Sequence, residues 1–303
     1  MATRVAVILN VHAGSVQGRL LAEQVADVLA AAGCDPTVTT GDGPNLTRLA
    51  QQALHDSHTR IVASGGDGTV NAVASVLVGS DAALGVLPLG TLNHFAKDLQ
   101  LPLDMAAAAQ VIAAGHHVTV DVGEVNGRIF VNNSSIGIYP SLVTERERLR
   151  RLGQPKWIAF GVAFSRIWTR YRHLHTTIQT AGQPLVATTP FVFVGNNEYE
   201  LEGLRMGGRR SLTQGQLHVC LAPHMTRGDL LRMVGSAMVN RLGAVEAFES
   251  FLAPECDIRG SGRSLLVSTD GEVTRMLSPL RYRIRPGALR VIVPAEREPG
   301  EPA

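Results

Sequence analysis

The first 122 residues alternate short apolar runs with longer segments in which apolar residues recur at helical spacing. Apolar runs of four or five residues are typical of buried parallel strands, and the amphipathic segments are typical of helices. The runs predict strands at Val5–Leu9, Thr37–Thr40, Arg60–Ala63 and Leu84–Leu87, alternating with helices at Gly18–Ala32, Asn45–Leu54, Thr69–Leu77, Asn93–Leu99 and Met105–Ala114. This alternation predicts an N-terminal α/β domain, residues 1–122, with a parallel sheet covered on both faces.

Beyond residue 122 the apolar positions alternate with polar ones, and Asn126-Gly127 between two such runs is typical of a hairpin turn. The pattern predicts a β-sandwich-like C-terminal domain over residues 123–295, with a helical insertion at 141–173 and a flexible tail at 296–303. Its later strands are expected at Thr176–Gln179, Pro190–Gly195, Gln216–Leu221, Ile258, Leu265–Ser268, Tyr282–Arg285 and Leu289–Val293.

A glycine-rich turn, Ser64–Asn71, lies between the third predicted strand and the helix after it. We expect Gly65, Gly66 and Gly68 to take positive φ and to point successive amides inward, which would form a cradle for an anion. The N-terminus of the following helix also favours a phosphate. Asp67 inside the cradle would repel a phosphate unless a cation lay between them, which predicts Mg²⁺ at Asp67. An ordinary Asp-Gly turn is the alternative explanation.

A second glycine-rich turn, Leu87–Ala96, also follows a strand and opens a helix. Its Thr91 offers a hydroxyl and an amide that suit either a ligand contact or a helix cap. The loop Asn10–Ser15 follows the first strand, and Thr40–Gly43 follows the second. Because the carboxyl ends of parallel strands share one edge, all four loops are expected to face one ligand.

Composition narrows the class of protein. With 45% apolar residues, 18% charged residues and a net charge of +2, the chain is globular and not a general nucleic-acid binder. The cysteines, Cys34, Cys220 and Cys256, are far apart and form no metal-binding pair, so we expect small buried hydrophobes. The short apolar N-terminal run predicts neither a signal sequence nor a membrane span, which favours a cytoplasmic protein.

Three motifs carry a resemblance to a known family: Gly65–Thr69 with Asn71, then Pro88–Ala96, then Asp270-Gly271-Glu272. In this order they resemble the bacterial diacylglycerol kinase and lipid kinase family, which also contains sphingosine and ceramide kinases. The resemblance runs over essentially the whole chain. It implies ATP- and Mg²⁺-dependent phosphorylation of a lipid hydroxyl, with the active site between the two domains. It also implies that ATP contacts Asn10, Gly14, Thr40, Gly65, Gly66, Asp67, Gly68, Thr69, Asn71 and Thr91.

Glu272 is the candidate general base, because a carboxylate just past a tight turn can project into a cleft and accept the proton of the attacking hydroxyl. Asp67 is the rival for this role. A solvated turn acid is the alternative interpretation of Glu272. The lipid acceptor, diacylglycerol-like or sphingoid, is left open.

The chain departs from the family pattern at three places. His94 and the pair Ile138-Tyr139 stand where the family commonly has aspartates. The loop Leu212–His218 contains glutamines where some members bind a structural Mg²⁺ through acidic residues, so that second metal is expected to be weak or missing. His94 and His218 are expected to be ordinary polar residues.

The segment 144–173 is rich in arginine and aromatic residues and holds both tryptophans. Such a stretch suits transient docking to an anionic membrane surface, which favours a cytoplasmic protein peripherally associated with the inner face of the membrane. A helix pair packed on the sandwich is the alternative. Two other functions also remain open: a NAD kinase-like enzyme, and a nucleotide- or lipid-binding regulator with impaired catalysis. A homodimer is compatible with the sequence.

Overall fold

The computed structural model describes residues 2–11, 18–151, 161–162, 165, 174–180, 182, 184–202, 205–209, 211–223, 228 and 249–295. The chain divides into two compact units. Unit 1 comprises Met1–Val122, Arg210–Gln214 and Arg285–Ala303, and unit 2 comprises Gly123–Arg209 and Gly215–Ile284. Two strands, β5 (His117–Val125) and β18 (Leu280–Ile292), contribute residues to both units.

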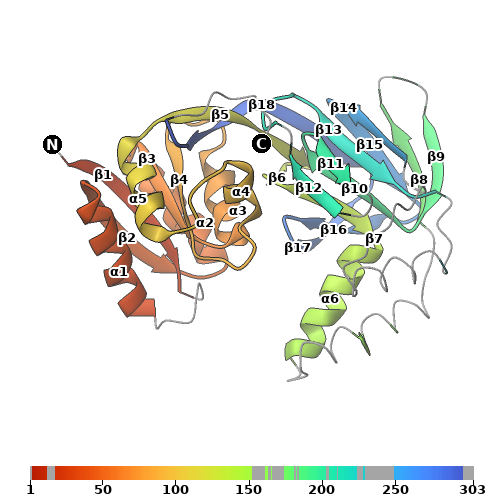
Figure 1. Ribbon diagram of the computed structural model, residues 1–303. Helices are drawn as coiled ribbons and strands as arrows, with labels where there is room; N and C mark the ends of the chain where they lie inside the picture. Colours follow the sequence, from red (N-terminus) through yellow and green to blue (C-terminus); the bar gives the residue numbers. More distant parts are fainter. Residues whose placement is uncertain are drawn as a thin grey trace. The chain divides into compact units, whose positions relative to one another are not determined.

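Unit 1 is an α/β domain built on a parallel sheet (Figure 1). The strand order is β2-β1-β3-β4, followed by the second half of β18, which pairs parallel to β4. The strands and helices are β1 (Thr3–Asn10), α1 (Gly18–Ala31), β2 (Cys34–Gly41), α2 (Pro44–His55), β3 (Arg60–Gly65), α3 (Asp67–Leu77), β4 (Ala83–Pro88), α4 (His94–Asp98) and α5 (Met105–Ala114). The predicted parallel sheet with its alternating helices is confirmed.

Alternating side chains of β1 explain why both faces of this sheet are covered. Val5, Val7 and Leu9 are buried in one cluster with residues of α1 and α5. Ala6 and Ile8, which point the other way, are buried as well. A buried valine, leucine or isoleucine stabilises the fold by about 1.5–3 kcal/mol, so a strand that is apolar on both faces requires a helical layer on each.

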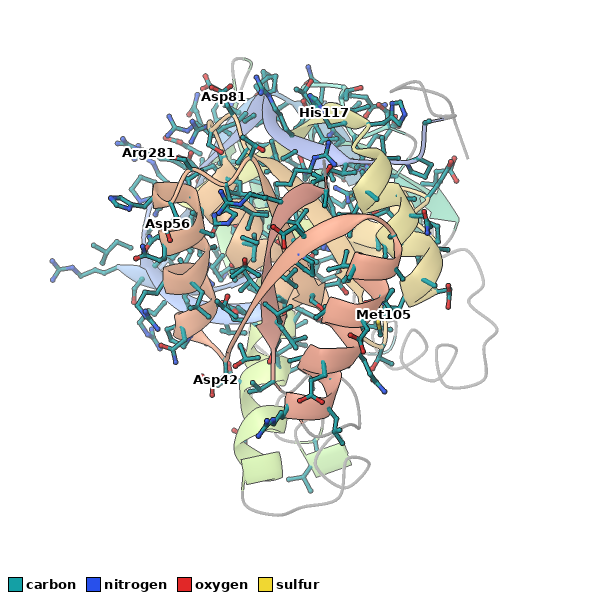
Figure 2. All side chains as sticks on the ribbon, turned by 90° about the vertical axis from the view of Figure 1, so that its left-hand side faces the viewer. Asp42, Asp56, Asp81, Met105, His117 and Arg281 are labelled. Carbon is teal, nitrogen blue, oxygen red and sulfur yellow. The ribbon has the colours of Figure 1, made fainter. Side chains whose placement is uncertain are left out.

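The helices of unit 1 run between two opposite edges of the sheet. Asp42 precedes α2 and lies at the lower edge in Figure 2, whereas Asp56 caps the other end of α2 and lies higher up. Asp81, just before β4, lies at the top. The lower edge in this view is therefore the edge at which the parallel strands end, and the turns that follow β2, β3 and β4, which were predicted to bind a ligand, begin there.

Unit 2 is a sandwich of mostly antiparallel strands (Figure 1). One sheet has the order β14-β13-β10-β7-β16-β17. In the other, the first half of β18 pairs with β15, β15 with β8, and β8 with β9, while β5 pairs with both β18 and β6. The elements are β6 (Arg128–Phe130), β7 (Asn133–Gly137), α6 (Ile138–Arg151), β8 (Leu174–Gln179), β9 (Leu185–Thr189), β10 (Phe191–Asn196), β11 (Tyr199–Glu202), β12 (Arg205–Arg209), β13 (Leu217–Leu221), β14 (Glu249–Ala253), β15 (Glu255–Gly260), β16 (Ser264–Thr269) and β17 (Glu272–Leu277).

The core of unit 2 lies between its sheets. Ile136 and Val192 come from one sheet, Ile178 and Tyr282 from the other, and all four belong to one buried cluster. The Tyr282 hydroxyl makes a 3.0 Å hydrogen bond to Ser134 Oγ across this core. The predicted β-sandwich-like C-terminal domain is confirmed, and Cys34, Cys220 and Cys256 are buried free thiols as expected.

The predicted helical insertion at 141–173 is described only in part. Helix α6 begins at Ile138, earlier than predicted, and ends at Arg151. Of the residues beyond Arg151 in this segment, the structure describes only 161–162 and 165. Neither Trp157 nor Trp168 lies within the described residues. In the part of the chain that is described, none of the helices has the length and hydropathy needed to cross a membrane.

Candidate functional site

The ends of β1 and β3 meet at the lower edge of unit 1. These strands are neighbours, and α1, which follows β1, packs on one face of the sheet. Asn10, the last residue of β1, donates from Nδ2 to Thr69 Oγ1 in the first turn of α3, over 3.1 Å. In open α/β sheets, ligands bind where connections from adjacent strands diverge, outside the carboxyl ends of the strands. The predicted Asn10, Gly65–Thr69 group is therefore brought together at such a place.

The glycines of the first turn have a different role from the one predicted. Gly66 has φ −92°, and neither Gly65 nor Gly68 is among the glycines with positive φ. The prediction of positive φ is wrong. A Cβ on Gly65 would lie 2.3 Å from Thr69 Oγ1, and one on Gly90 would lie 2.5 Å from the Cα of Gly66. Glycine is needed at position 65 because the Thr69 side chain packs against it, and at position 90 because the two glycine-rich turns approach each other closely.

Gly68 differs from its neighbours. A Cβ added there would meet no atom within 4 Å, so the position faces open space. It lies in the first turn of α3, which begins at Asp67 and has Gly66 as its N-cap. The first amides of an α-helix have no partner within the helix, and they attract anions. The open space beside Gly68 therefore suits a phosphate group.

Asp67 links the two turns. Its Oδ1 accepts a hydrogen bond of 3.2 Å from the backbone N–H of Phe95 in α4. Its other carboxylate oxygen makes no hydrogen bond or ion pair among the described residues. One oxygen therefore fixes the side chain, while the other remains able to bind a cation such as Mg²⁺, which prefers carboxylate oxygens.

The second turn is shaped by Asn93, whose φ is +50°. Its Oδ1 accepts from Gly90 N over 3.0 Å, and its Nδ2 donates to Gly90 O over 2.8 Å. Both ends of this side chain are thus used within the turn, which explains why Asn93 is buried. Thr91, on the same turn, is exposed and can contact a ligand.

Three further predicted ATP contacts have different surroundings. Asn71 is buried in α3, and its Oδ1 has no hydrogen-bond partner among the described residues. Thr40 lies beside Leu9 near the end of β2 and is exposed. Gly14 lies outside the described residues. The Asp67 oxygen, the space at Gly68 and the start of α3 together fit a bound ATP phosphate with Mg²⁺.

Glu272 belongs to unit 2, where it begins the edge strand β17. It pairs with Thr269 across a two-residue turn, Asp270-Gly271, whose φ values of +47° and +86° are both positive. Its carboxylate forms an ion pair with Arg128 of β6 over 2.5 Å, and its side chain is 60% exposed. Glu272 is therefore an accessible carboxylate with one cationic partner.

Asp270 is a second carboxylate of this turn, and sequence reasoning assigned it no role. Its oxygens accept three backbone hydrogen bonds: from Val131 over 2.7 Å, from Asn132 over 2.9 Å and from Asn133 over 3.0 Å. Burial raises the pKa of Asp270 to about 6, although these amides and the charge of Arg209 act in the opposite direction. The residue as a whole is partly exposed. In the sequence, the one hint of a role for Asp270 is that an aspartate stands at a turn position where asparagine would fit equally well.

Arg209 is the buried cation beside this group. Its guanidinium donates to Val131 O over 2.6 Å, to Asn196 O over 3.3 Å and to Asn132 Oδ1 over 3.1 Å, and it stacks on Tyr199 at 5.7 Å. The 131–133 segment therefore gives its amides to Asp270 and a carbonyl to Arg209.

His94 and His218, expected to be ordinary polar residues, have different surroundings. His218 Nδ1 accepts from Tyr199 N over 3.1 Å, and burial lowers its pKa, partly offset by Glu198. His94 is exposed. Within the described residues, no three histidine, cysteine, aspartate or glutamate side chains gather as a metal site would require.

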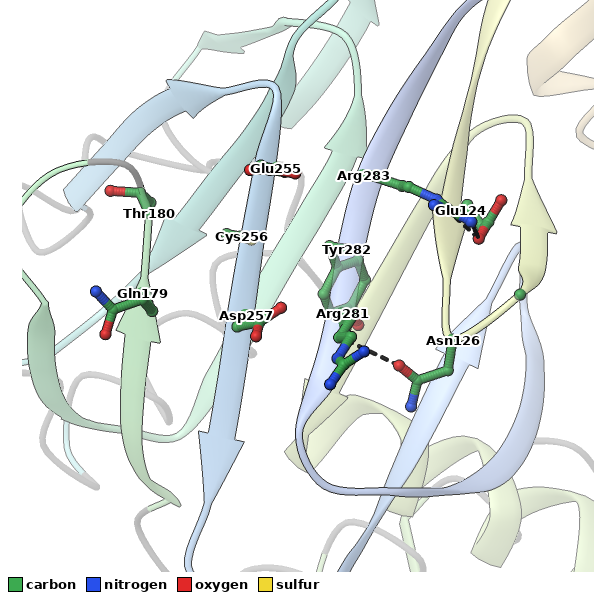
Figure 3. A pocket seen from close by; sticks show the side chains of 11 residues that line it. Glu124, Asn126, Gln179, Thr180, Glu255, Cys256, Asp257, Arg281, Tyr282 and Arg283 are labelled. Atoms are coloured by element: carbon green, nitrogen blue, oxygen red, sulfur yellow. Dashed lines mark hydrogen bonds and ion pairs between the residues drawn. The ribbon is translucent and has the colours of Figure 1, made fainter.

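Unit 2 also contains a cavity of about 540 Å³. It lies over β15 and β18, and Figure 3 shows Arg283 pointing toward Glu124, with which it forms an ion pair. Asp257 and Arg281 lie opposite each other in the strand register. None of the predicted catalytic or ATP-contacting residues lines it.

Comparison with known proteins matches both units to the same group. The diacylglycerol kinase catalytic domain matches residues 4–125, and the YegS C-terminal NAD kinase β-sandwich-like domain matches residues 139–293. A Pseudomonas fluorescens protein named probable lipid kinase YegS-like is 30% identical over 272 residues, which cover 88% of each chain.

Solved structures show that the fold is shared. A crystal structure of a diacylglycerol kinase from Bacillus anthracis is 24% identical, with a TM-score of 0.72 over 97% of this chain and 98% of that one. Yeast NADH kinase is 11% identical, with a TM-score of 0.50 over 98% of this chain and 85% of that one.

Proposed function

Because this chain belongs to the family of YegS-like lipid kinases, with their diacylglycerol kinase catalytic domain, we propose that it transfers the γ-phosphoryl group of ATP to a lipid hydroxyl with Mg²⁺. The observation that carries this proposal is the first turn of α3, where Gly68 faces open space and the preceding residue, Asp67, has a carboxylate oxygen without a protein partner among the described residues. Phosphoryl transfer depends mainly on positioning and on charge stabilisation, and both are available at such a turn.

The nucleotide would bind at the lower edge of unit 1. The amides at the start of α3 and Thr91 would contact the phosphates, while Asn10 and Thr40 lie at the ends of the neighbouring strands. Asp67 would hold Mg²⁺, which neutralises charge on the phosphates when bound. The Asp67 bond to Phe95 N keeps this carboxylate in place before any ligand arrives.

Glu272 would act as the general base. The lipid O–H bond breaks, its proton goes to the Glu272 carboxylate, and the oxygen forms a bond to the γ-phosphorus as the bond to the β-phosphate oxygen breaks and ADP leaves. Asp67 is the alternative base. The Arg128 guanidinium orients the Glu272 carboxylate through Oε2, and Oε1, which has no partner among the described residues, can accept the proton.

One experiment separates this function from its alternatives. Purified protein is incubated with Mg²⁺, γ-³²P-labelled ATP, and either a total lipid extract or NAD. A labelled lipid supports the proposal and identifies the acceptor class. A labelled dinucleotide would establish a NAD kinase activity instead, and nucleotide binding without any labelled product would indicate an impaired regulator.

Association with an anionic membrane surface through residues 144–173 remains part of this proposal. Most of that segment lies outside the described residues, so the support is its composition. Flotation of the protein with vesicles tests it: binding to vesicles containing an anionic phospholipid, but not to neutral vesicles, is the expected result. Equal behaviour with both would eliminate charge-driven docking. A homodimer also remains a prediction, which light scattering would test.

A further inference from the structure

The turn that carries Glu272 is joined to the 128–133 segment at three places. Arg128 forms the ion pair with Glu272 itself. The Asp270 carboxylate accepts the three amides of residues 131–133. The backbone N–H of Asp270 also donates to Asn133 O over 2.9 Å. These contacts make the turn and the 128–133 segment one local unit.

The turn could form without the hydrogen bonds that the Asp270 side chain accepts. A two-residue turn with positive φ at both positions accepts asparagine at least as well as aspartate. An asparagine has one acceptor oxygen and one NH₂ group, however, so it cannot accept hydrogen bonds at both ends. The three amide donors require the carboxylate, which indicates a role beyond turn formation.

The three amides and, after them, the charge of Arg209 favour the ionised form of this carboxylate, against the larger effect of burial. Arg209 lies against the same 131–133 segment and is buried. Hydrogen bonds to an ionised group are stronger than neutral ones, so the three amide bonds are strongest while Asp270 is a carboxylate. Asp270 therefore binds the backbone N–H groups of residues 131–133, while Arg209 binds the carbonyl of Val131.

We propose that Asp270 is the positioning residue for Glu272: by anchoring the turn to the amides of residues 131–133, it fixes the place from which the candidate base works. The proposal rests on the proposed kinase function for its catalytic consequence. It also makes a structural claim, that the place of Glu272 depends on the Asp270 carboxylate, which can be tested without any lipid acceptor.

The structural test uses ¹H–¹⁵N spectra of wild type and Asp270→Asn. In wild type, we expect the amide resonances of residues 131–133 to shift together as the pH falls through about 6, because protonation of Asp270 weakens their bonds. The Glu272 amide should follow with the same midpoint. The charged group that acts on Asp270 is Arg209, which stays protonated over this range, so the titration belongs to Asp270.

Asp270→Asn should displace the Glu272 amide resonance and abolish the common titration. Asp104→Asn is the matched control, since Asp104 also accepts a backbone N–H, at the start of α5 in unit 1, yet lies outside the machinery described above. A Glu272 resonance that neither follows the wild-type titration nor moves in Asp270→Asn would overturn the proposal. Because the wild-type titration needs no variant, a failure of Asp270→Asn to fold does not block the test.

The kinetic test measures lipid phosphorylation and ATP binding separately. We expect Asp270→Asn to lower kcat by about 10²-fold, the scale on which misplacement of a reacting group acts, with ATP affinity unchanged. A folded Asp270→Asn protein with wild-type kcat would refute the positioning role. If wild type labels no lipid, the proposed function fails, and the spectra still decide whether Asp270 positions Glu272.

Discussion

Gly66 and Gly90 lie in contact, so that a Cβ built on Gly90 would come within 2.5 Å of the Gly66 Cα. The same added atom would lie 2.6 Å from Asn93 Oδ1, which is bonded to the backbone at Gly90. The two glycine-rich turns are thus packed backbone to backbone. Their spacing depends on the absence of side chains at these positions.

Gly90→Ala should destabilise the protein. The methyl group must displace backbone atoms of Gly66, and overpacking of this kind typically lowers the free energy of unfolding by about 1–3 kcal/mol. Urea denaturation measures the change. ATP affinity should fall in parallel, because the turn at Gly66 moves. Unchanged stability would show that the turns separate without cost.

Gly68→Ala should separate ligand binding from folding. Its Cβ meets no protein atom, and alanine is favoured over glycine in a helix, so stability should be unchanged or higher by up to about 1 kcal/mol. ATP affinity should fall by about tenfold or more, because the methyl group occupies the space assigned to a phosphate. Calorimetric titration with ATP gives the affinity. If Gly68→Ala bound ATP with wild-type affinity, the phosphates would not bind beside Gly68.

Asp67→Asn should weaken ATP binding only when Mg²⁺ is present. The asparagine oxygen can still accept from Phe95 N, so the fold is kept, but the negative charge that attracts the metal is lost. Titrations with and without Mg²⁺ measure the difference, with Asp104→Asn as the control. Equal loss in both conditions would mean that Asp67 acts through structure and not through a metal.

Glu272→Gln should lower kcat by about 10²–10⁴-fold, the usual contribution of a general base, while ATP affinity stays close to wild type. Glutamine keeps the length of the side chain and can still accept a hydrogen bond from Arg128. Steady-state kinetics and nucleotide titration provide the two values. If the kcat of Glu272→Gln were close to that of wild type, Glu272 would not be the general base, and Asp67 would be the remaining candidate.

The stability of the protein should depend on Asp270 between about pH 4 and pH 6. Burial raises its pKa to about 6 in the folded state, above the value of about 3.9 in an unfolded chain, so the folded state binds the proton more tightly. The stabilisation from this group is therefore fully present below pH 4 and is lost as the pH rises through 6.

The comparison that isolates Asp270 is the difference in unfolding free energy between wild type and Asp270→Asn, measured at several pH values. That difference should change between pH 4 and 6 and level off above. A constant difference over this range would show that Asp270 titrates at the same pH in both states.

Local patterns predicted the strands and helices of unit 1 well. Val5–Leu9 is apolar at every position, which is enough to indicate a strand buried on both faces. The turn at Asn126-Gly127 was equally clear, and its φ values of +47° and +85° agree with a hairpin. Both signals depend only on neighbouring residues, so they can be recognised from the chain alone.

The edge strands of unit 2 gave no such signal. Exposed positions occur along β14, β17 and β9, and their sequences show no regular alternation of apolar residues. These segments form strands because they pair with a neighbouring strand of the sheet. The predicted strands Tyr282–Arg285 and Leu289–Val293 are one strand, β18. Pro286-Gly287 suggested a break, but β18 continues because its first half pairs with β15 and its second with β4.

The order of the elements, the two glycine-rich turns and the kinase motifs could be recognised without a structure, because each rests on residues close together in the chain. The contact between Gly66 and Gly90 and the hydrogen bond from Phe95 N to Asp67 exist only in the folded chain. The same holds for the three amides on Asp270. These contacts join residues that are 24 to 139 positions apart, and such a separation leaves no local pattern to read.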